Sequence, residues 1–275
     1  MRDEAADHRA EIFAANRARG RIALAVGPGG GATQPVRIAE EGSLRVRFPG
    51  ARARTLEAVI LNTAGGIAGG DSFDVAIAVE EGARLAATTA AAEKVYRTLG
   101  PAACIDLRLA VSAGGTLCWL PQETILFDRA GLRRSIEADV AEGGCLVMAE
   151  TIVFGRTAMG EAVQRGSLFD RWRVRHGGRL RFAETVRLEG AIAETLQHPA
   201  VAAGSVAVAT VLTIPGEEET VSAARAAPVR SEVAASAWNG LAVVRIVAQE
   251  AMWLRHDLAA VLTAMRVPLP RLWVH

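Results

Sequence analysis

The sequence predicts a mostly β protein made of stacked β-hairpin repeats, as a β-helix-like or two-layer arrangement, with about two helices in its C-terminal region. Three observations support this prediction: a Gly-centred motif recurs, apolar and polar residues alternate beside it, and helical spacing appears in the C-terminal third. A Gly-centred turn between alternating runs is typical of a β-hairpin. Its near-constant period is typical of units that bury their apolar faces against their neighbours.

The recurring motif reads V-x-x-G-[A/G]-x-L. Its four copies begin at Val79, Val111, Val140 and Val174, at intervals of 32, 29 and 34 residues. Side chains in a strand alternate between faces, so the Leu that closes each copy sets a register for the strand that follows. Two residues after this Leu, the same face carries an apolar side chain in every copy: Ala87, Trp119, Met148 and Phe182. We therefore predict that this face lies in the core.

Four carboxylates fall on the same face further along the chain: Glu93, Glu123, Glu150 and Glu184. An unpaired carboxylate is costly to bury, and buried charges are usually paired, protonated or bound to a metal. These four are therefore candidate functional residues. The alternative is that a one-residue bulge turns any of them to the solvent, because a bulge moves every later side chain to the other face.

The length and composition are enough for one large β-rich domain or two small ones, and we predict a single domain over residues 1–275. The chain has 51% hydrophobic residues and a net charge of +1, so it lacks a basic footprint for nucleic acid or an anionic membrane. No apolar run reaches the roughly 18 to 20 residues that span a bilayer. The charged N-terminus lacks the apolar region of a secretory signal, and the three cysteines lie in strand-like sequence. We expect a cytoplasmic protein with reduced thiols.

In chain order, residues 1–18 are expected to be a mobile or helical lead, and 19–34 a short strand running into a flexible glycine-rich loop. Alternation predicts strands at 44–48, 56–61, 73–79, 105–111, 116–120, 124–127, 136–140, 146–154, 205–214 and 242–248, with a fourth hairpin at 172–188. That hairpin carries five arginines, as a solvated basic face or a docking surface for an acidic partner: Arg171, Arg173, Arg175, Arg179 and Arg181.

Two helices are predicted near the C-terminus. Residues 217–227 begin with acidic residues, which suits the positive end of a helix dipole. Residues 250–265 have apolar residues at helical spacing, most simply a face that packs on the core: Leu254, Leu258, Val261 and Met265.

The glycine-rich segment NTAGGIAGGD (62–71) does not match a phosphate-binding loop. A Walker-type loop places Gly-Lys-[Ser/Thr] at the start of a helix, whereas here Gly70 is followed by Asp71 and an alternating strand. We interpret the segment as a tight reversal that needs positive φ angles at several glycines. Asp71 either accepts hydrogen bonds from nearby backbone N–H groups or is a functional carboxylate at the edge of the sheet.

Common catalytic and metal motifs are missing. The sequence contains no G-x-S-x-G, H-E-x-x-H or C-x-x-C, and its five histidines lack the spacing of a closed transition-metal site. Paired carboxylates can perform hydrolytic acid–base chemistry, but aromatic residues, which usually bind sugars, make up only 5% of the chain. The residues alone therefore indicate a β-rich protein with inward carboxylates and name no function.

Several motifs together resemble the urease accessory protein family UreD, called UreH in some organisms. They are NTAGGIAGGD (62–71), GARLAATTAAAEKVYR (82–97), WLPQETILF (119–127), ETIVFGRTAMGE (150–161), AWNGLAVVRI (237–246) and PLPRLWVH (268–275). They span most of the chain in the family's order, and the first 20 residues are the main departure.

The resemblance implies a non-enzymatic chaperone with a helically stacked β fold and two helices. The family binds apo-urease and the accessory protein UreF, and through UreF the GTPase UreG. It supports delivery of nickel to an active site that a lysine carbamate completes, and an internal tunnel has been proposed for the metal. Nickel is then cargo in transit, with no stable metal site or cofactor, because hard oxygen ligands bind nickel weakly enough for transfer.

Matching motif positions imply seven candidate tunnel residues: Asp71, Thr88, Thr89, Glu93, Lys94, Glu150 and Glu184. In this hypothesis the carboxylates contact the metal, the threonines line its path, and Lys94 balances the interior charge. Two alternatives remain. The protein is a pure scaffold that bridges urease to the other accessory proteins, or it is a carboxylate-dependent hydrolase.

Overall fold

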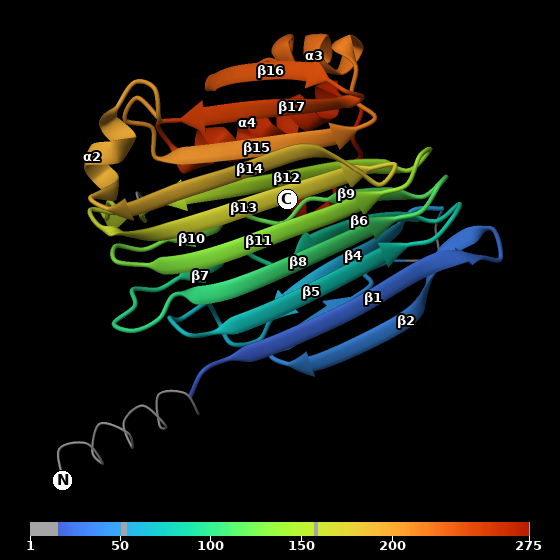
Figure 1. Cartoon of the computed structure of the whole chain (residues 1–275), viewed down its shortest axis with the longest axis horizontal. Helices are drawn as coiled ribbons and strands as arrows, with labels where there is room; N and C mark the ends of the chain where they lie inside the picture. The colour runs from blue at the N-terminus through green and yellow to red at the C-terminus, as the bar shows by residue number, and fades with distance from the viewer. Residues whose placement is uncertain (1–15, 51–53, 157–158, 275) are drawn as a thin grey trace.

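Two β-sheets packed face to face form the body of the protein (Figure 1). The computed structural model describes residues 16–50, 54–156 and 159–274, so the lead expected at residues 1–18 lies mostly outside the described residues. The first sheet has seven strands, in the order β14 (Arg179–Gly190), β13 (Gly166–His176), β11 (Gly131–Val140), β8 (Ala103–Val111), β5 (Ser72–Val79), β1 (Arg19–Gly29) and β2 (Ala32–Gly42).

The second sheet has ten strands among the described residues. Eight follow the order β16 (Glu232–Trp238), β17 (Leu241–Ala248), β15 (Ala207–Ile214), β12 (Cys145–Phe154), β9 (Thr116–Trp119), β6 (Arg84–Thr89), β4 (Leu56–Asn62) and β3 (Leu44–Arg47). The short strands β7 (Glu93–Val95) and β10 (Thr124–Leu126) pair with each other, and β10 also pairs with β12. The predicted class, mostly β with stacked repeats, is confirmed.

The chain coils between the sheets, which makes the repeat a solenoid. β5, β8 and β11 are parallel neighbours in the first sheet, and β6, β9 and β12 are parallel neighbours in the second. The first three copies of the Gly-centred motif connect a strand of one sheet to a strand of the other. The hairpin prediction is therefore wrong for these copies, and it is confirmed only for the fourth, where β13 and β14 pair antiparallel.

Burial on both sides of the turn explains the difference. Val79 and Leu85 flank the first turn and are each 1% exposed, because the glycine bend turns both side chains into the space between the sheets. Gly82 at this turn has a φ of +73°, a conformation that costs glycine little. In the fourth copy the corresponding Leu180 is 49% exposed, since a paired hairpin gives it no second sheet to pack against.

The first strands also differ from expectation. The predicted flexible loop is part of an antiparallel hairpin of β1 and β2, with its turn at Gly30 and Gly31. The reversal at residues 62–71 is as predicted. Gly65, Gly66 and Gly70 have positive φ, and the Asp71 carboxylate accepts hydrogen bonds from the backbone N–H groups of Ala68 (2.7 Å) and Ala18 (2.9 Å).

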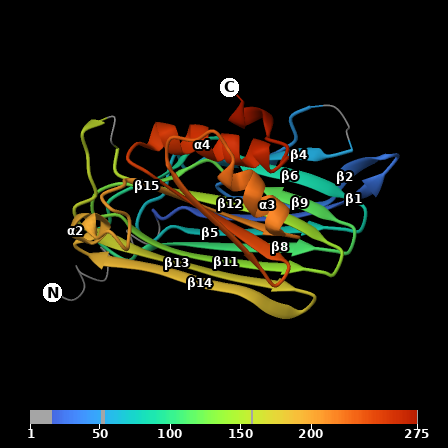
Figure 2. The same cartoon turned by 90° about the horizontal axis from the view of Figure 1, so that it is seen from above.

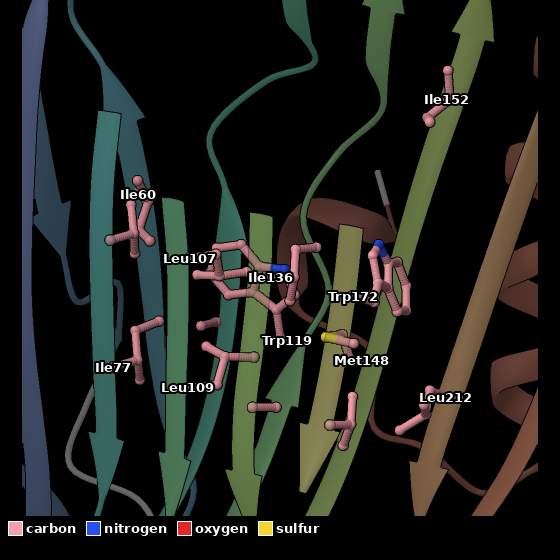
Figure 3. Packing of buried hydrophobic residues seen from close by; sticks show 14 of the residues in the cluster. Ile60, Ile77, Leu107, Leu109, Trp119, Ile136, Met148, Ile152, Trp172 and Leu212 are labelled. Carbon is pink, nitrogen blue, oxygen red and sulfur yellow. The ribbon is translucent and has the colours of Figure 1, made fainter. Parts of the chain in front are cut away.

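The main core lies between the sheets. Figure 3 shows Leu107, Ile136 and Trp172 from the first sheet beside Trp119 and Met148 from the second. A second apolar cluster lies on the other face of the second sheet, under α3 (Glu218–Arg225) and α4 (Ala251–Ala264), the two predicted helices (Figure 2). Other elements were not predicted from the sequence, among them β16, the short helix α2 (Ile192–Gln197) and the 3₁₀ turn η2 (Arg271–Trp273).

The carboxylate of Asp257 in α4 is fully buried and fastens the helix to the segment before β16. It accepts hydrogen bonds from the backbone N–H groups of Arg230 (3.0 Å) and Ser231 (2.7 Å), and it contacts Nδ1 of His256 at 3.1 Å. Burial alone would raise the pKa of Asp257, but together these hydrogen bonds hold this pKa below its ordinary value.

Asp257→Asn is expected to lower the free energy of unfolding at pH 7 by about 1 to 2 kcal/mol, because a charged acceptor stabilises a hydrogen bond more than a neutral one. A depressed pKa contributes stability above the unfolded value, about 3.9 for Asp, and that contribution is lost as the pH falls through the folded value. Urea unfolding of both proteins should therefore show the difference shrinking below about pH 4. The control is Glu81→Gln at an exposed turn position. A difference that stays constant with pH would contradict this account.

Candidate functional site

A cavity of about 420 Å³ lies between the two sheets, at the β13–β14 edge of the first sheet and beside α2. Its walls come from β11, β12, β13, β14, β15, β17 and α2, and most of its lining is apolar. Arg187 and Val201 also line it, and both have exposed side chains, so the cavity reaches the surface. Five further charged side chains besides Arg187 lie on its inner wall and rim: Arg134, Glu150, Asp170, Glu184 and Arg245.

Arg134, Glu150 and Asp170 form a buried ion cluster, which is the centre of the candidate site. The three residues are 4%, 6% and 5% exposed. Arg134 donates from Nε to Oδ1 of Asp170 (3.0 Å) and from Nη2 to Oδ2 (2.6 Å), which is a bidentate pair. Its remaining nitrogen, Nη1, donates to Oε2 of Glu150. One guanidinium therefore bridges two carboxylates.

Strand register brings these residues together. Arg134 and Asp170 are directly aligned in the parallel strands β11 and β13 of the first sheet. Glu150 comes from β12 in the facing sheet, two residues beyond the core residue Met148. The cluster therefore joins the two layers, and its geometry depends on how the sheets are stacked.

Two tryptophans complete the hydrogen bonding of the carboxylates. Nε1 of Trp119 donates to Oε1 of Glu150 (2.7 Å), and Nε1 of Trp172 donates to Oδ1 of Asp170 (3.2 Å). With the three donors of Arg134, each of the four carboxylate oxygens accepts at least one hydrogen bond. Charged groups can stay buried when their oxygens all accept hydrogen bonds in this way.

Burial shifts the protonation equilibria of the cluster. It raises the pKa of the Glu150 carboxyl above its ordinary value, although Arg134 and Trp119 oppose this shift. Burial would lower the pKa of Arg134, but Asp170 and Glu150 together hold it above its ordinary value. Arg134 is therefore a permanent cation inside the protein.

A second arginine–carboxylate pair lies at the rim of the cavity. Arg245 of β17 donates from Nη2 to Oε2 of Glu184 on β14, and from Nη1 to Oγ1 of Thr210 (3.2 Å). Both partners are partly exposed, so this pair is hydrated while the inner cluster is not.

Of the seven candidate residues, the structure brings Glu150 and Glu184 together at this cavity. Both lie on long continuous strands, β12 and β14, along which the alternation persists. Asp71 is 4% exposed and lies in the turn before β5, held by the backbone hydrogen bonds described above. The backbone hydrogen bonds of the first of its two interpretations are thus present, and Asp71 does not line this cavity.

The two threonines are the last two residues of β6. Adjacent residues of a strand face opposite sides, so Thr88 and Thr89 do not line one path. Oγ1 of Thr88 lies 3.3 Å from Nε1 of Trp273 in η2, and Oγ1 of Thr89 accepts the N–H of Gln122 (2.9 Å).

Glu123 leaves the predicted face because its strand is interrupted: β9 ends at Trp119, before Pro121, and Glu123 pairs with Arg255 of α4 at 2.9 Å. Glu93 keeps the predicted face although β6 ends at Thr89. It starts β7, where it aligns through Thr124 with the core residue Ile152. Glu93 accepts a hydrogen bond from Nδ2 of Asn62 (3.1 Å), and burial raises its pKa despite this bond. The prediction of an inward face is therefore wrong for Glu123 and confirmed for Glu93.

Lys94 is exposed, so the prediction that it balances the interior charge is wrong. Arg134 has that role. Arg134, Asp170 and Arg245 are not among the residues predicted from the sequence, although alternation could have revealed the first two. Arg134 lies between Leu132 and Ile136 on one strand face, and Asp170 lies between Leu168 and Trp172 on another.

The donor set limits what the site can hold. Among the described residues, no group of three His, Cys, Asp or Glu side chains is arranged to hold a metal ion. The cavity offers carboxylate oxygens that are already engaged, which suits weak and reversible contact with a cation more than storage. Cys104, Cys118 and Cys145 are free thiols. None of the helices in residues 16–50, 54–156 and 159–274 has the length and apolar character of a membrane span.

Comparison with known proteins gives a consistent result along the whole chain. The family profile described as UreD urease accessory protein matches residues 18–274. Urease accessory protein UreD of Rhodopseudomonas palustris strain BisA53 is 54% identical over 266 residues, which cover 96% of this chain and 93% of that protein. The protein of the same name from strain BisB18 is 55% identical over 268 residues, or 96% and 97%. Urease accessory protein UreD 3 of Bradyrhizobium sp. strain BTAi1 is 51% identical over 278 residues and the full length of both.

Proposed function

This chain belongs to the UreD family of urease accessory proteins, and on this premise we propose that it carries nickel between its two sheets on the way to the urease active site. As an accessory protein it acts on urease and is not an enzyme. In the proposal it binds apo-urease and UreF, and through UreF the GTPase UreG. Its free cysteines support a cytoplasmic location.

The observation that carries the proposal is the carboxylate-bearing cavity between the sheets. Glu150 and Glu184 were both candidates from the sequence, and both line this one space of about 420 Å³ together with Asp170. That volume accommodates a cation with part of its water shell, since one water occupies about 30 Å³ in the liquid. Carboxylate oxygens are weak ligands for nickel compared with His or Cys, so the cavity favours passage over retention.

A pure scaffold is the second candidate, and one observation favours it. Every carboxylate oxygen of Glu150 and Asp170 already accepts a hydrogen bond from the protein. In this alternative the cluster only joins the two sheets, and the protein bridges urease to UreF without contacting nickel.

The accessory role itself is tested by co-purifying the chain with UreF and apo-urease, then activating urease with nickel in the presence and absence of the chain. We expect a complex, and activation that depends on the chain. Activation that is equally fast without the chain would contradict the proposal.

Glu184→Gln separates passage from scaffolding. The substitution keeps the size of the side chain and removes the rim carboxylate, so nickel delivery is expected to fall about tenfold while the complexes still form. Nickel content of urease and urease activity are the measurements. The matched control is Glu189→Gln on the same strand, whose carboxylate is 65% exposed and pairs with Arg187 outside the cluster. Normal delivery by Glu184→Gln would favour the scaffold.

A further inference from the structure

We propose that Arg134 is an internal competitor for the cargo cation: its guanidinium occupies the oxygens of Glu150 and Asp170 and so keeps the cavity from retaining nickel. This inference rests on the proposed passage of nickel between the sheets. It gives Arg134 a specific function, whereas the passage of nickel by itself does not require this residue.

Geometry supports competition. The three donating nitrogens of Arg134 engage three of the four oxygens of Glu150 and Asp170, and they reach both carboxylates at once. The planar fork of arginine makes such bidentate pairing possible, whereas a lysine ammonium is a point charge that cannot hold both carboxylates in this way. Because Arg134 is fixed in β11, it stays beside the carboxylates when a cation leaves.

Without Arg134, two unpaired carboxylates would face the same space. Glu150 and Asp170 come from opposite sheets onto one cavity wall. Two neighbouring carboxylates beside a space that admits water can supply oxygen ligands to a divalent cation that keeps part of its water shell. The two tryptophan N–H groups would still orient Glu150 and Asp170.

The charge balance agrees with this role. One guanidinium faces two carboxylates, so the inner cluster has a formal charge of −1 when both carboxylates are ionised. This charge attracts a cation, while the guanidinium prevents both carboxylates from closing on it. At the rim, one guanidinium (Arg245) meets one carboxylate (Glu184), and partial exposure weakens this pair.

Nickel binding by the purified full chain tests the inference, with calorimetry or equilibrium dialysis as the readout. Arg134→Met keeps a side chain of similar length and removes the charge. It is expected to bind nickel about 100-fold more tightly than the natural chain, which corresponds to roughly 3 kcal/mol, the low end of the cost of breaking a buried ion pair. The control is the neutral triple variant, Arg134→Met with Glu150→Gln and Asp170→Asn, which should lose the gained binding.

Folding of the variant is part of the same test. If Arg134→Met is only partly folded, nickel should raise its melting temperature much more than that of the natural chain, because a ligand that binds the folded state stabilises it. Arg134→Lys retains the charge but not the fork, and it should show intermediate nickel affinity. No gain in affinity or melting temperature in either variant would overturn the inference.

The outcome is separable from the proposed function. If Arg134→Met retains nickel and slows urease activation, the proposed passage and the proposed role of Arg134 both hold. If it retains nickel but urease is activated at the natural rate, Arg134 is the competitor and passage through the cavity is wrong. If nickel binding does not change while Glu184→Gln still impairs delivery, the passage stands and the role of Arg134 fails.

Discussion

Arg134→Met is expected to lower the free energy of unfolding by about 3 to 5 kcal/mol, among the largest effects of any single substitution in this protein. The substitution leaves Glu150 and Asp170 buried without their cation. Both carboxylates are about nine-tenths or more buried, so water cannot replace the lost partner without opening the sheets. Urea unfolding, with the free energy extrapolated to zero denaturant, is the measurement.

The neutral triple variant is the control for this effect. It removes all three charges but keeps an oxygen acceptor for each of the Trp119 and Trp172 N–H groups. Its cost is therefore expected to be only about 1 to 2 kcal/mol, because neutral replacement of a whole buried ion cluster avoids leaving an uncompensated charge. If the single and triple variants were equally destabilised, the cost of losing Arg134 would not depend on the charges of Glu150 and Asp170.

Urease activation with the neutral triple variant is expected to fall to the level seen without the chain. Removing the inner charges leaves the cavity with no ionised carboxylate deeper than Glu184, so a divalent cation has no partner across the space between the sheets. Because an expected cost of only about 1 to 2 kcal/mol should leave this variant folded, its complexes with apo-urease and UreF should form normally. Nickel content of urease, together with co-purification, measures the two effects separately.

Two results would count against this expectation. Activation at the natural level, with complexes intact, would mean that the cluster only fastens the sheets together and that the protein is a scaffold. Loss of the complexes would instead mean that the cluster shapes the docking surface, and the activation defect would then say nothing about nickel passage.

Local pattern in the sequence predicted most strands and both long helices. Alternation predicted β3, β4, β5, β8 and β9, and apolar residues three or four positions apart predicted α4. The local pattern could not show that β5 pairs with β8 rather than with β6. A Gly-centred turn has the same sequence pattern in a hairpin as between two stacked sheets. Pairing partners are chosen by burial of both faces, which is a property of the whole fold.

The same limit applies to the candidate site. The register that begins at Leu146 places Glu150 on the core face, since β12 runs without a break to Phe154. It fails for Glu123 because β9 ends before Pro121, and a period of two has no meaning across an interruption. Motif matching assigned Asp71 and Lys94 to the interior path, although one is held by backbone N–H groups and the other is exposed.

By itself, the sequence determined the family, the mostly β class and the inward position of Glu150. Only the tertiary structure decided what Glu150 meets: Arg134 and Asp170 arrive from β11 and β13 in the opposite sheet, 16 and 20 residues away along the chain. The physical reason is that alternation and turns are short-range properties, which residues within a few positions set. A buried ion cluster depends on the register between two stacked sheets, and that register is fixed only when their apolar faces pack together.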